Sequence, residues 1–192
     1  MQKKVIVWGT GNVGRPAIRA VLSHQQLSLE AVIVSNPDKV GQDAGHLAGT
    51  AYCGVAAVSD WHSALQSGAD ALVYSATADT RMEEAIGELI ACLEAGINVV
   101  APGFYLYLDP QSSPEEALAP VKAACERSGA SLFVSGIDPG WVMDRLPAVL
   151  SGASANISEI RTREIFNYAL YDQPHVVREV IGFGKSMDEL PM

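Results

Sequence analysis

Short, unbroken apolar runs alternate along this chain with longer stretches in which apolar residues recur at helical spacing. Six apolar runs predict strands, at residues 4–8, 29–34, 55–58, 71–74, 98–100 and 131–134. Strands of this kind are typical of a parallel sheet that is buried on both faces, and the helical stretches between them indicate crossover connections. The pattern therefore predicts an α/β fold with a doubly wound parallel sheet.

Helix start and stop signals lie between the predicted strands. Residues 80–83 (Thr-Arg-Met-Glu) and 113–116 (Ser-Pro-Glu-Glu) each match a capping box, which predicts a helix start. Gly96 and Gly129 follow these helices and predict their ends, because glycine adopts the left-handed conformation that terminates helices. Pro120 lacks an N–H group and is expected to interrupt the second helix.

The first predicted strand runs directly into a G-x-G-x-x-G motif formed by Gly9, Gly11 and Gly14. The first glycine permits a tight turn, the second lets the backbone approach a pyrophosphate, and the third lets a helix pack close to the strand. A helix is expected to follow, with an apolar face that includes Val13, Ala17 and Val21. The motif predicts a Rossmann domain that binds a dinucleotide at Gly9, Thr10, Gly11, Asn12 and Val13; a glycine-rich structural turn is the alternative interpretation.

The end of the second strand bears on the choice of cofactor. Domains that bind NAD usually place an acidic residue there, whereas this chain has Ser35, Asn36 and Lys39. A hydroxyl, an amide and an ammonium group can bind a 2′-phosphate, so these residues favour NADP. Asp38 keeps NAD open, because the turn could bring its carboxylate towards the ribose. Another Rossmann ligand, such as a sugar nucleotide, is a further alternative.

Loops after the later strands are expected to surround the reacting centre, because open parallel sheets bind ligands beyond the carboxyl ends of their strands. Small residues at Ala76, Thr77 and Ala101 leave room for the cofactor. Phe104 is predicted to line a substrate pocket, although core packing is equally consistent with its position. Asp138 is followed by proline and is interpreted as the N-cap of a helix.

A new pattern begins after residue 150. Residues 157–166 alternate partly between apolar and charged side chains, which predicts a strand with one solvated face, and residues 174–181 predict a short helix. We interpret residues 1–150 as a dinucleotide-binding Rossmann domain and residues 151–192 as the incomplete start of a substrate and dimerisation domain. Such a segment is too small to bury a core of its own. It belongs to a fragment, docks on a partner, or is completed between subunits.

Composition limits the possible partners. The chain has 192 residues, is 48% hydrophobic and carries a net charge of −9 without a basic cluster, so we expect no nucleic-acid partner. No transit or membrane-spanning pattern is present, which predicts a cytoplasmic protein. Three cysteines, Cys53, Cys92 and Cys125, and the four histidines lack the spacing of metal ligands, so no metal is expected.

Four segments together resemble a known family. They are residues 9–15 (Gly-Thr-Gly-Asn-Val-Gly-Arg), 34–37 (Val-Ser-Asn-Pro), 135–140 (Ser-Gly-Ile-Asp-Pro-Gly) and 164–168 (Glu-Ile-Phe-Asn-Tyr). The chain resembles the dihydrodipicolinate reductase-like proteins, and within them the group of 2,4-diaminopentanoate dehydrogenase and the NADP-dependent amine dehydrogenases. The resemblance implies reduction of a C=N bond, or its reverse, by hydride transfer from a nicotinamide, and the substrate class we expect is a small carbonyl, imine or amine compound. It also implies a homodimer, a longer chain with a full second domain, and substrate contacts at Asn167, Tyr168 and Tyr171.

Two departures from the family concern catalysis. The His-His pair and lysine of dihydrodipicolinate reductases are replaced at residues 165–168, and the glutamate of the amine dehydrogenases is missing from residues 102–105. No catalytic residue is therefore identified, and Tyr105 and Asp138 are the candidates for a proton-transferring group. An NAD(P)-dependent oxidoreductase is the first hypothesis, and a nucleotide-binding protein without turnover is the alternative.

Overall fold

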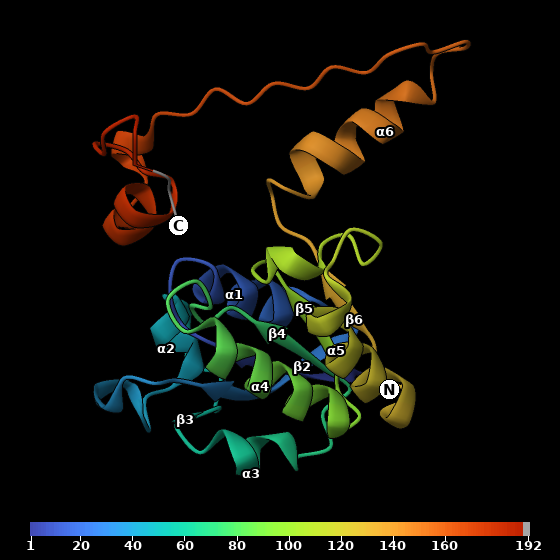
Figure 1. Cartoon of the computed structure of the whole chain (residues 1–192). Helices are drawn as coiled ribbons and strands as arrows, with labels where there is room; N and C mark the ends of the chain where they lie inside the picture. Colours follow the sequence, from blue (N-terminus) through green and yellow to red (C-terminus); the bar gives the residue numbers. More distant parts are fainter. Residues whose placement is uncertain (190–192) are drawn as a thin grey trace. The chain divides into compact units, whose positions relative to one another are not determined.

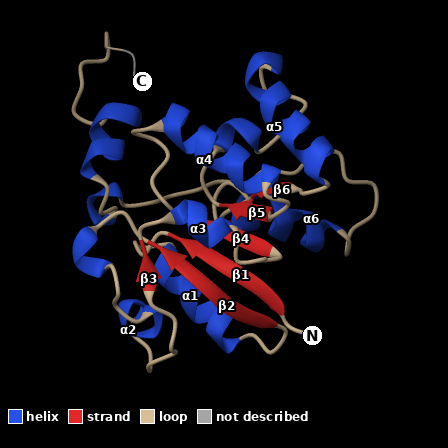
Figure 2. Ribbon diagram, turned by 90° about the horizontal axis from the view of Figure 1, so that it is seen from below, coloured by secondary structure: helices blue, strands red, loops and turns tan. Residues whose placement is uncertain are grey.

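The computed structural model of the chain describes residues 1–189 and separates into two compact units, Met1–Pro139 and the part that starts at Gly140. The first unit is built on one six-stranded sheet with the order β3-β2-β1-β4-β5-β6 (Figures 1 and 2). Every pair of neighbouring strands is parallel. The strands are β1 (Lys3–Trp8), β2 (Leu27–Ile33), β3 (Ala57–Val58), β4 (Ala71–Tyr74), β5 (Asn98–Ala101) and β6 (Leu132–Val134). All six predicted strands and the doubly wound α/β fold are confirmed, with strand ends that differ by one or two residues.

Helices cover the sheet on two faces and create two hydrophobic cores. One core combines α1 (Gly14–Ser23) and α2 (Ala44–Ala48) with β1, β2 and β3. The other combines α3 (Trp61–Leu65), α4 (Met82–Glu94) and α5 (Glu115–Ser128) with β1, β4, β5 and β6. Two 3₁₀ turns, η1 (Pro37–Lys39) and η2 (Tyr105–Tyr107), follow β2 and β5. Both lie at the carboxyl edge of the sheet, where a doubly wound fold binds its ligands.

The central strand β1 serves both cores because successive side chains of a strand point to opposite faces. Ile6 and Trp8 belong to the core under α4 and α5, whereas Val5 and Val7 belong to the core under α1 and α2. All four side chains are buried. The strand ends at Trp8, so that the glycine motif begins at the carboxyl edge of the sheet.

Both predicted capping boxes are wrong, although the two helices that they predict, α4 and α5, are present. Arg81 occupies the cap position of α4, and no side chain caps this helix. Ser113 precedes α5, but its hydroxyl donates to the carbonyl oxygens of Leu106 and Asp109 at 2.5 and 3.1 Å. The hydroxyl therefore holds the preceding loop, and Pro114 takes the cap position.

The prediction that Pro120 interrupts its helix is also wrong, since α5 continues from Glu115 to Ser128. An interior proline removes one backbone hydrogen bond, and the burial of Val121 and Ala124 in the core keeps the helix in place. Helix ends follow the prediction: Gly129 is the C-cap of α5 with φ of 76°, and Gly96 follows α4 with φ of 78°.

The buried face of α1 differs from the predicted one. Gly14, Ile18 and Val21 are buried, whereas Val13 is 48% exposed. Val13 lies at the cap position, before the helix begins, and its side chain therefore does not follow the spacing of the helix.

The second unit contains η3 (Trp141–Arg145), α6 (Leu146–Ser151), η4 (Tyr168–Leu170) and η5 (Val176–Val180). Asp138 is not an N-cap: the peptide bond to Pro139 is cis, and the helix starts after Gly140, whose N–H donates to Asp144 Oδ2 at 2.7 Å. The helix predicted at 174–181 is present as the turn η5.

The strand predicted at residues 157–166 is wrong, because this segment has no regular secondary structure. Ile160 is 54% exposed and Ile165 is 90% exposed. A strand needs a neighbour for its backbone hydrogen bonds, and the described part of the second unit contains none. The assignment of residues 1–150 and 151–192 to two functional domains stays a prediction, and residues 190–192 lie outside the described residues.

Within residues 1–189, no helix is long and apolar enough to cross a membrane. The same residues contain no group of three or more His, Cys, Asp or Glu side chains that could hold a metal ion.

Candidate functional site

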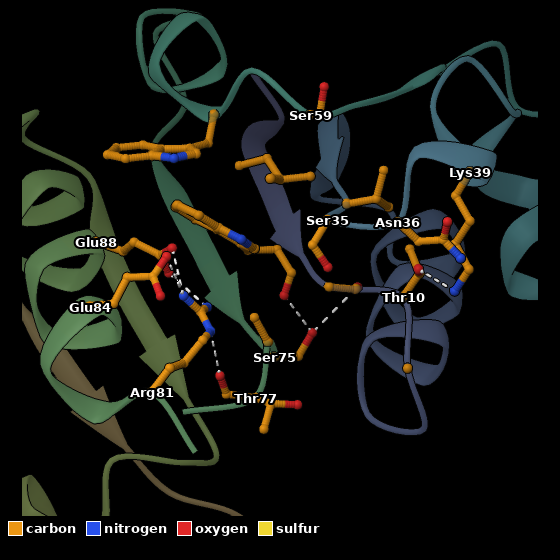
Figure 3. A pocket seen from close by; sticks show the side chains of 17 residues that line it. Thr10, Ser35, Asn36, Lys39, Ser59, Ser75, Thr77, Arg81, Glu84 and Glu88 are labelled. Atoms are coloured by element: carbon orange, nitrogen blue, oxygen red, sulfur yellow. Dashed lines mark hydrogen bonds and ion pairs between the residues drawn. The ribbon is translucent and has the colours of Figure 1, made fainter. Parts of the chain in front are cut away.

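A cavity of about 570 Å³ opens at the carboxyl edge of the sheet in the first unit (Figure 3). The loops that follow β1, β2 and β4 supply most of it, together with residues after β3 and on α4. Its lining residues are Trp8, Gly9, Thr10, Gly11, Ile33, Val34, Ser35, Asn36, Lys39, Ser59, Trp61, Ser75, Ala76, Thr77, Arg81, Glu84 and Glu88. Eight of the eleven residues predicted to bind the cofactor are among them.

The three glycines of the motif have different surroundings. A Cβ atom on Gly14 would lie 2.0 Å from the Gly9 carbonyl oxygen, so only glycine permits this approach of α1 to the loop. Gly9 has φ of 104°, and a Cβ on it would lie 2.9 Å from backbone atoms of Ser75 and Ala76. By contrast, a Cβ on Gly11 would meet no atom within 4 Å. Gly11 thus borders open space at the point where a pyrophosphate would approach the backbone.

The N-terminus of α1 adjoins this open space. Val13 is its cap residue, and no side chain caps the first turn. The first N–H groups of a helix have no partner within the helix and carry a partial positive charge, so they can bind an anion. Asn12 and Val13 are exposed here, but their side chains do not line the cavity. Their predicted contribution is therefore limited to the backbone.

The loop after β2 carries one ammonium group into the cavity. The Lys39 Nζ donates to the Thr10 hydroxyl oxygen at 3.0 Å, which connects this loop to the glycine motif. Asn36 caps η1, and its side-chain oxygen accepts the Asp38 N–H at 2.9 Å. Asp38 is exposed and does not line the cavity. The lining at this end therefore contains a cation and polar groups, without a carboxylate.

The loop after β4 closes the cavity on another side. The Ser75 hydroxyl donates to the Trp8 carbonyl oxygen at 2.7 Å and so joins the ends of β4 and β1. Ala76 and Thr77 line the cavity, as predicted from their small size and position. Ala101 does not line it, because this last residue of β5 is fully buried in the core.

Tyr74, Arg81 and Glu88 form a polar cluster on the side of the cavity next to α4, which was not predicted from the sequence. Arg81 Nη1 and Nη2 donate to the two carboxylate oxygens of Glu88 at 2.8 and 2.9 Å, and Nη2 also donates to the Tyr74 hydroxyl oxygen at 2.8 Å. The Tyr74 hydroxyl donates to Glu88. Burial, followed by the neighbouring Glu88 carboxylate, raises the pKa of Tyr74, so this hydroxyl keeps its proton. The seven-residue spacing of Arg81 and Glu88 along one helix face was the available signal.

Two tryptophans were also missed. Trp8 and Trp61 line the cavity, with ring centroids 5.2 Å apart, and Trp61 stacks on His62 at 3.6 Å. Trp8 could have been found from its position as the last residue of the first strand. Trp61 follows the third strand, where no motif marks it.

The predicted catalytic and substrate residues lie elsewhere. Phe104 has no exposed surface and packs against Tyr74 and Tyr107 in the core, so it does not line the cavity. Tyr105 is 55% exposed, and neither it nor Asp138 lines the cavity.

The remaining predicted substrate residues belong to the second unit. Tyr168 and Tyr171 pack edge-to-face against Phe166, and the Asn167 side chain accepts the Ala169 N–H at 3.1 Å. Their role as substrate contacts stays a prediction.

Comparisons with known proteins agree with this geometry. A curated amine dehydrogenase from Streptomyces virginiae is 48% identical over 188 residues, which are 97% of this chain and 52% of that protein. The 4-hydroxy-tetrahydrodipicolinate reductase of Nitrosomonas eutropha is 36% identical over 97 residues, which are 50% of this chain and 34% of that protein. The solved amine dehydrogenase from Mycobacterium smegmatis superposes with a TM-score of 0.68 at 26% identity, over 82% of this chain and 46% of that one. The chain thus spans about half the length of the Streptomyces protein and less than half the length of the other two relatives.

The family described as "Dihydrodipicolinate reductase, N-terminus" matches residues 3–102, which include every strand from β1 to β5 and all the residues that line the cavity. The resemblance inferred from the four sequence segments is thereby confirmed. The chain belongs to the dihydrodipicolinate reductase family.

Proposed function

We propose that this chain forms the nucleotide-binding part of an NAD(P)-dependent oxidoreductase that acts on a small carbonyl, imine or amine compound. The observation that carries the proposal is the open space at Gly11, beside an uncapped helix N-terminus and the Lys39 ammonium. This combination suits a ligand with a pyrophosphate and further phosphate groups. Family membership and the similarity to amine dehydrogenases support the reaction class.

Each part of the cavity has a role in this proposal. The backbone of residues 9–13 and the first turn of α1 bind the pyrophosphate, while the loop of residues 75–77 supports the cofactor from the β4 side. The nicotinamide, when bound, supplies or accepts the hydride. The protein holds this group and excludes water around it, so precise positioning is its main contribution.

NADP is the preferred cofactor in this proposal. A 2′-phosphate carries negative charge, and the end of the cavity formed by Ser35, Asn36 and Lys39 offers one cation and no carboxylate. The Lys39 ammonium has three N–H donors, of which Thr10 takes one. The others remain available to a phosphate.

The substrate is expected to be bound with the help of the second domain and a second copy of the chain. Ile165 and Leu170 in the second unit are 90% and 77% exposed, and the homodimer of this proposal would bury such apolar side chains in its interface. Substrate contacts at Asn167, Tyr168 and Tyr171 belong to this proposal, with Tyr105 and Asp138 as candidates for proton transfer.

Turnover by the full-length protein tests the proposal. The purified protein is titrated with NADPH and NADH, and NADPH consumption is then followed with a panel of small ketones in the presence and absence of ammonia. Oxidation of NADPH that depends on a ketone, or on a ketone with ammonia, is expected. Nucleotide binding without turnover across the panel would favour a nucleotide-binding protein that lacks activity, and no binding of either nucleotide would overturn both functions.

A further inference from the structure

Arg81 contacts the nucleotide-binding loop and not only the acidic residues around it. Its Nε donates to the Thr77 carbonyl oxygen at 2.9 Å, while Nη1 and Nη2 donate to Glu88 and Tyr74 (Figure 3). Nη1 also lies 3.4 Å from a carboxylate oxygen of Glu84. The guanidinium therefore directs its donors to protein acceptors, and hydrogen bonding to Glu88 raises its pKa, so it remains charged.

This arrangement assigns different tasks to the two cations of the cavity. Figure 3 shows Lys39 and Arg81 on opposite sides of it. Lys39 has one protein partner among the hydrogen bonds described, whereas Arg81 has three. A saturated guanidinium next to two carboxylates has little attraction for a phosphate. Arg81 is thus better suited to hold the protein than to hold an anion.

The residues behind Arg81 are firmly fixed. Glu88 is 9% exposed, and Tyr74 is 1% exposed in the hydrophobic core, where its ring packs against Trp8 and Phe104. The ion pair of Arg81 and Glu88 is partly buried, and such a pair contributes little net stability because its charges lose hydration. Such a pair can be retained because it specifies one conformation.

The loop of residues 75–77, which Arg81 contacts, packs against the glycine motif. Ser75 bonds to the carbonyl oxygen of Trp8, and the backbone of Ser75 and Ala76 lies 2.9 Å from the position of a Cβ on Gly9. A shift of Thr77 would therefore be transmitted to the backbone beside Gly9 and would change the width of the cavity.

We propose that Arg81 is a positioning residue of the nucleotide site, which Glu88 and Tyr74 hold in place and which fixes the loop of residues 75–77 through the Thr77 carbonyl group. The proposal rests on the nucleotide-binding function proposed above. Wild-type NADPH binding tests that function alone, whereas differences among the variants below test the role of Arg81.

Arg81→Lys is the first variant. Lysine keeps the positive charge and can still pair with Glu88, but it lacks the planar set of donors that reaches Glu88, Tyr74 and Thr77 together. We expect NADPH to bind about tenfold more weakly, with little change in thermal midpoint. Wild-type affinity in a folded Arg81→Lys protein would overturn the proposal.

Tyr74→Phe separates positioning from direct contact, because Tyr74 does not line the cavity. Loss of its hydroxyl should weaken NADPH binding about threefold. The Tyr74→Phe, Arg81→Lys double variant should bind no more weakly than Arg81→Lys, since Tyr74 acts through Arg81. If the losses of NADPH affinity in the two single variants multiplied in the double variant, Tyr74 would not act through Arg81.

A second pair of variants covers the case in which a single substitution unfolds the protein. Arg81→Met with Glu88→Leu replaces the ion pair by apolar side chains and should restore the thermal midpoint. Weak NADPH binding by this folded double variant supports positioning, and wild-type affinity shows a purely structural role. Arg127→Lys is the matched control. Arg127 forms an ion pair at 2.5 Å with Glu94, which lies on α4 like Glu88, but neither Arg127 nor Glu94 lines the cavity. The affinity of this variant for NADPH should equal that of the wild type.

Discussion

The Lys39 ammonium lies 3.0 Å from the Thr10 hydroxyl oxygen and donates a hydrogen bond to it. Thr10 is the second residue of the glycine motif, and Lys39 ends the turn after β2. The bond therefore joins the two loops that, in our proposal, bind the pyrophosphate and the ribose phosphate. It also holds the ammonium group at the edge of the cavity.

Lys39→Ala should discriminate between the two nicotinamide nucleotides. NADPH binding is expected to weaken about tenfold, because a charge-assisted bond to the 2′-phosphate is lost, whereas NADH binding should change less than about twofold. The measurement is a pair of fluorescence titrations on each protein. Lys122→Ala serves as the control, because it removes the same charge from an exposed position of α5. Equal losses of NADPH and NADH in Lys39→Ala would contradict the phosphate assignment.

Alanine substitution should lower the stability of the folded state at Gly14 but leave it nearly unchanged at Gly11. In Gly14→Ala the new Cβ would lie 2.0 Å from the Gly9 carbonyl oxygen, and the resulting overpacking should cost about 1–3 kcal/mol. In Gly11→Ala the Cβ enters open space, so the free energy of unfolding should stay within about 0.5 kcal/mol of the wild-type value. Chemical denaturation measures both. An equally stable Gly14→Ala protein would show that α1 does not pack against the loop as described.

One of the three cysteines should be unreactive in the folded protein. Cys92 is fully buried, and this burial, together with the nearby Glu88 carboxylate, raises the pKa of its thiol to about 12. Cys53 and Cys125 are half-buried. A thiol reagent at mildly alkaline pH should therefore modify no more than these two in the native state, and all three in denaturant. Rapid native modification of Cys92, located by peptide mapping, would refute its burial.

Asp43 should make the folded state sensitive to acid. Partial burial raises the pKa of its carboxyl, but hydrogen bonds from the backbone of Cys53, Gly54 and His46 outweigh this effect and bring the pKa below its ordinary value. A depressed pKa contributes stability that is present above the unfolded-state pKa and is lost as the pH falls through the folded-state pKa.

The deficit of Asp43→Asn in thermal midpoint should therefore be largest near neutral pH and shrink towards about pH 3. Thermal melts of both proteins across this range give the result. Glu126→Gln, at an exposed carboxylate of α5, is the matched control. A deficit for Asp43→Asn that is constant with pH would indicate a purely steric effect.

Local patterns predicted the sheet well. The apolar strands and the spacing of Gly9, Gly11 and Gly14 depend on neighbours in sequence and on the backbone, and the structure has the strands and the close turn that these patterns require. Ser35, Asn36 and Lys39 line the cavity for the same reason, since the end of a strand fixes where the following loop begins.

Other features depend on contacts that local sequence does not reveal. The Ser113 hydroxyl donates to carbonyl groups of the preceding loop and does not cap the helix. The helix that contains Pro120 continues because core packing stabilises it. From the sequence, Phe104 could equally line a pocket or fill the core. In the structure it packs against the ring of Tyr74 from β4 and lies in the core. The Arg81 cluster needs α4 to lie across β4, which no single segment specifies.

Nucleotide binding at Gly11 is the central claim, and a titration of the wild type and Gly11→Ala with NADPH tests it most directly. Trp8 and Trp61 line the cavity, so bound NADPH should quench their fluorescence in a saturable way. We predict saturation with the wild type and no saturable change with the equally stable Gly11→Ala protein, whose methyl group occupies the space for the pyrophosphate. Equal binding of NADPH by both proteins, or by neither, would contradict the account.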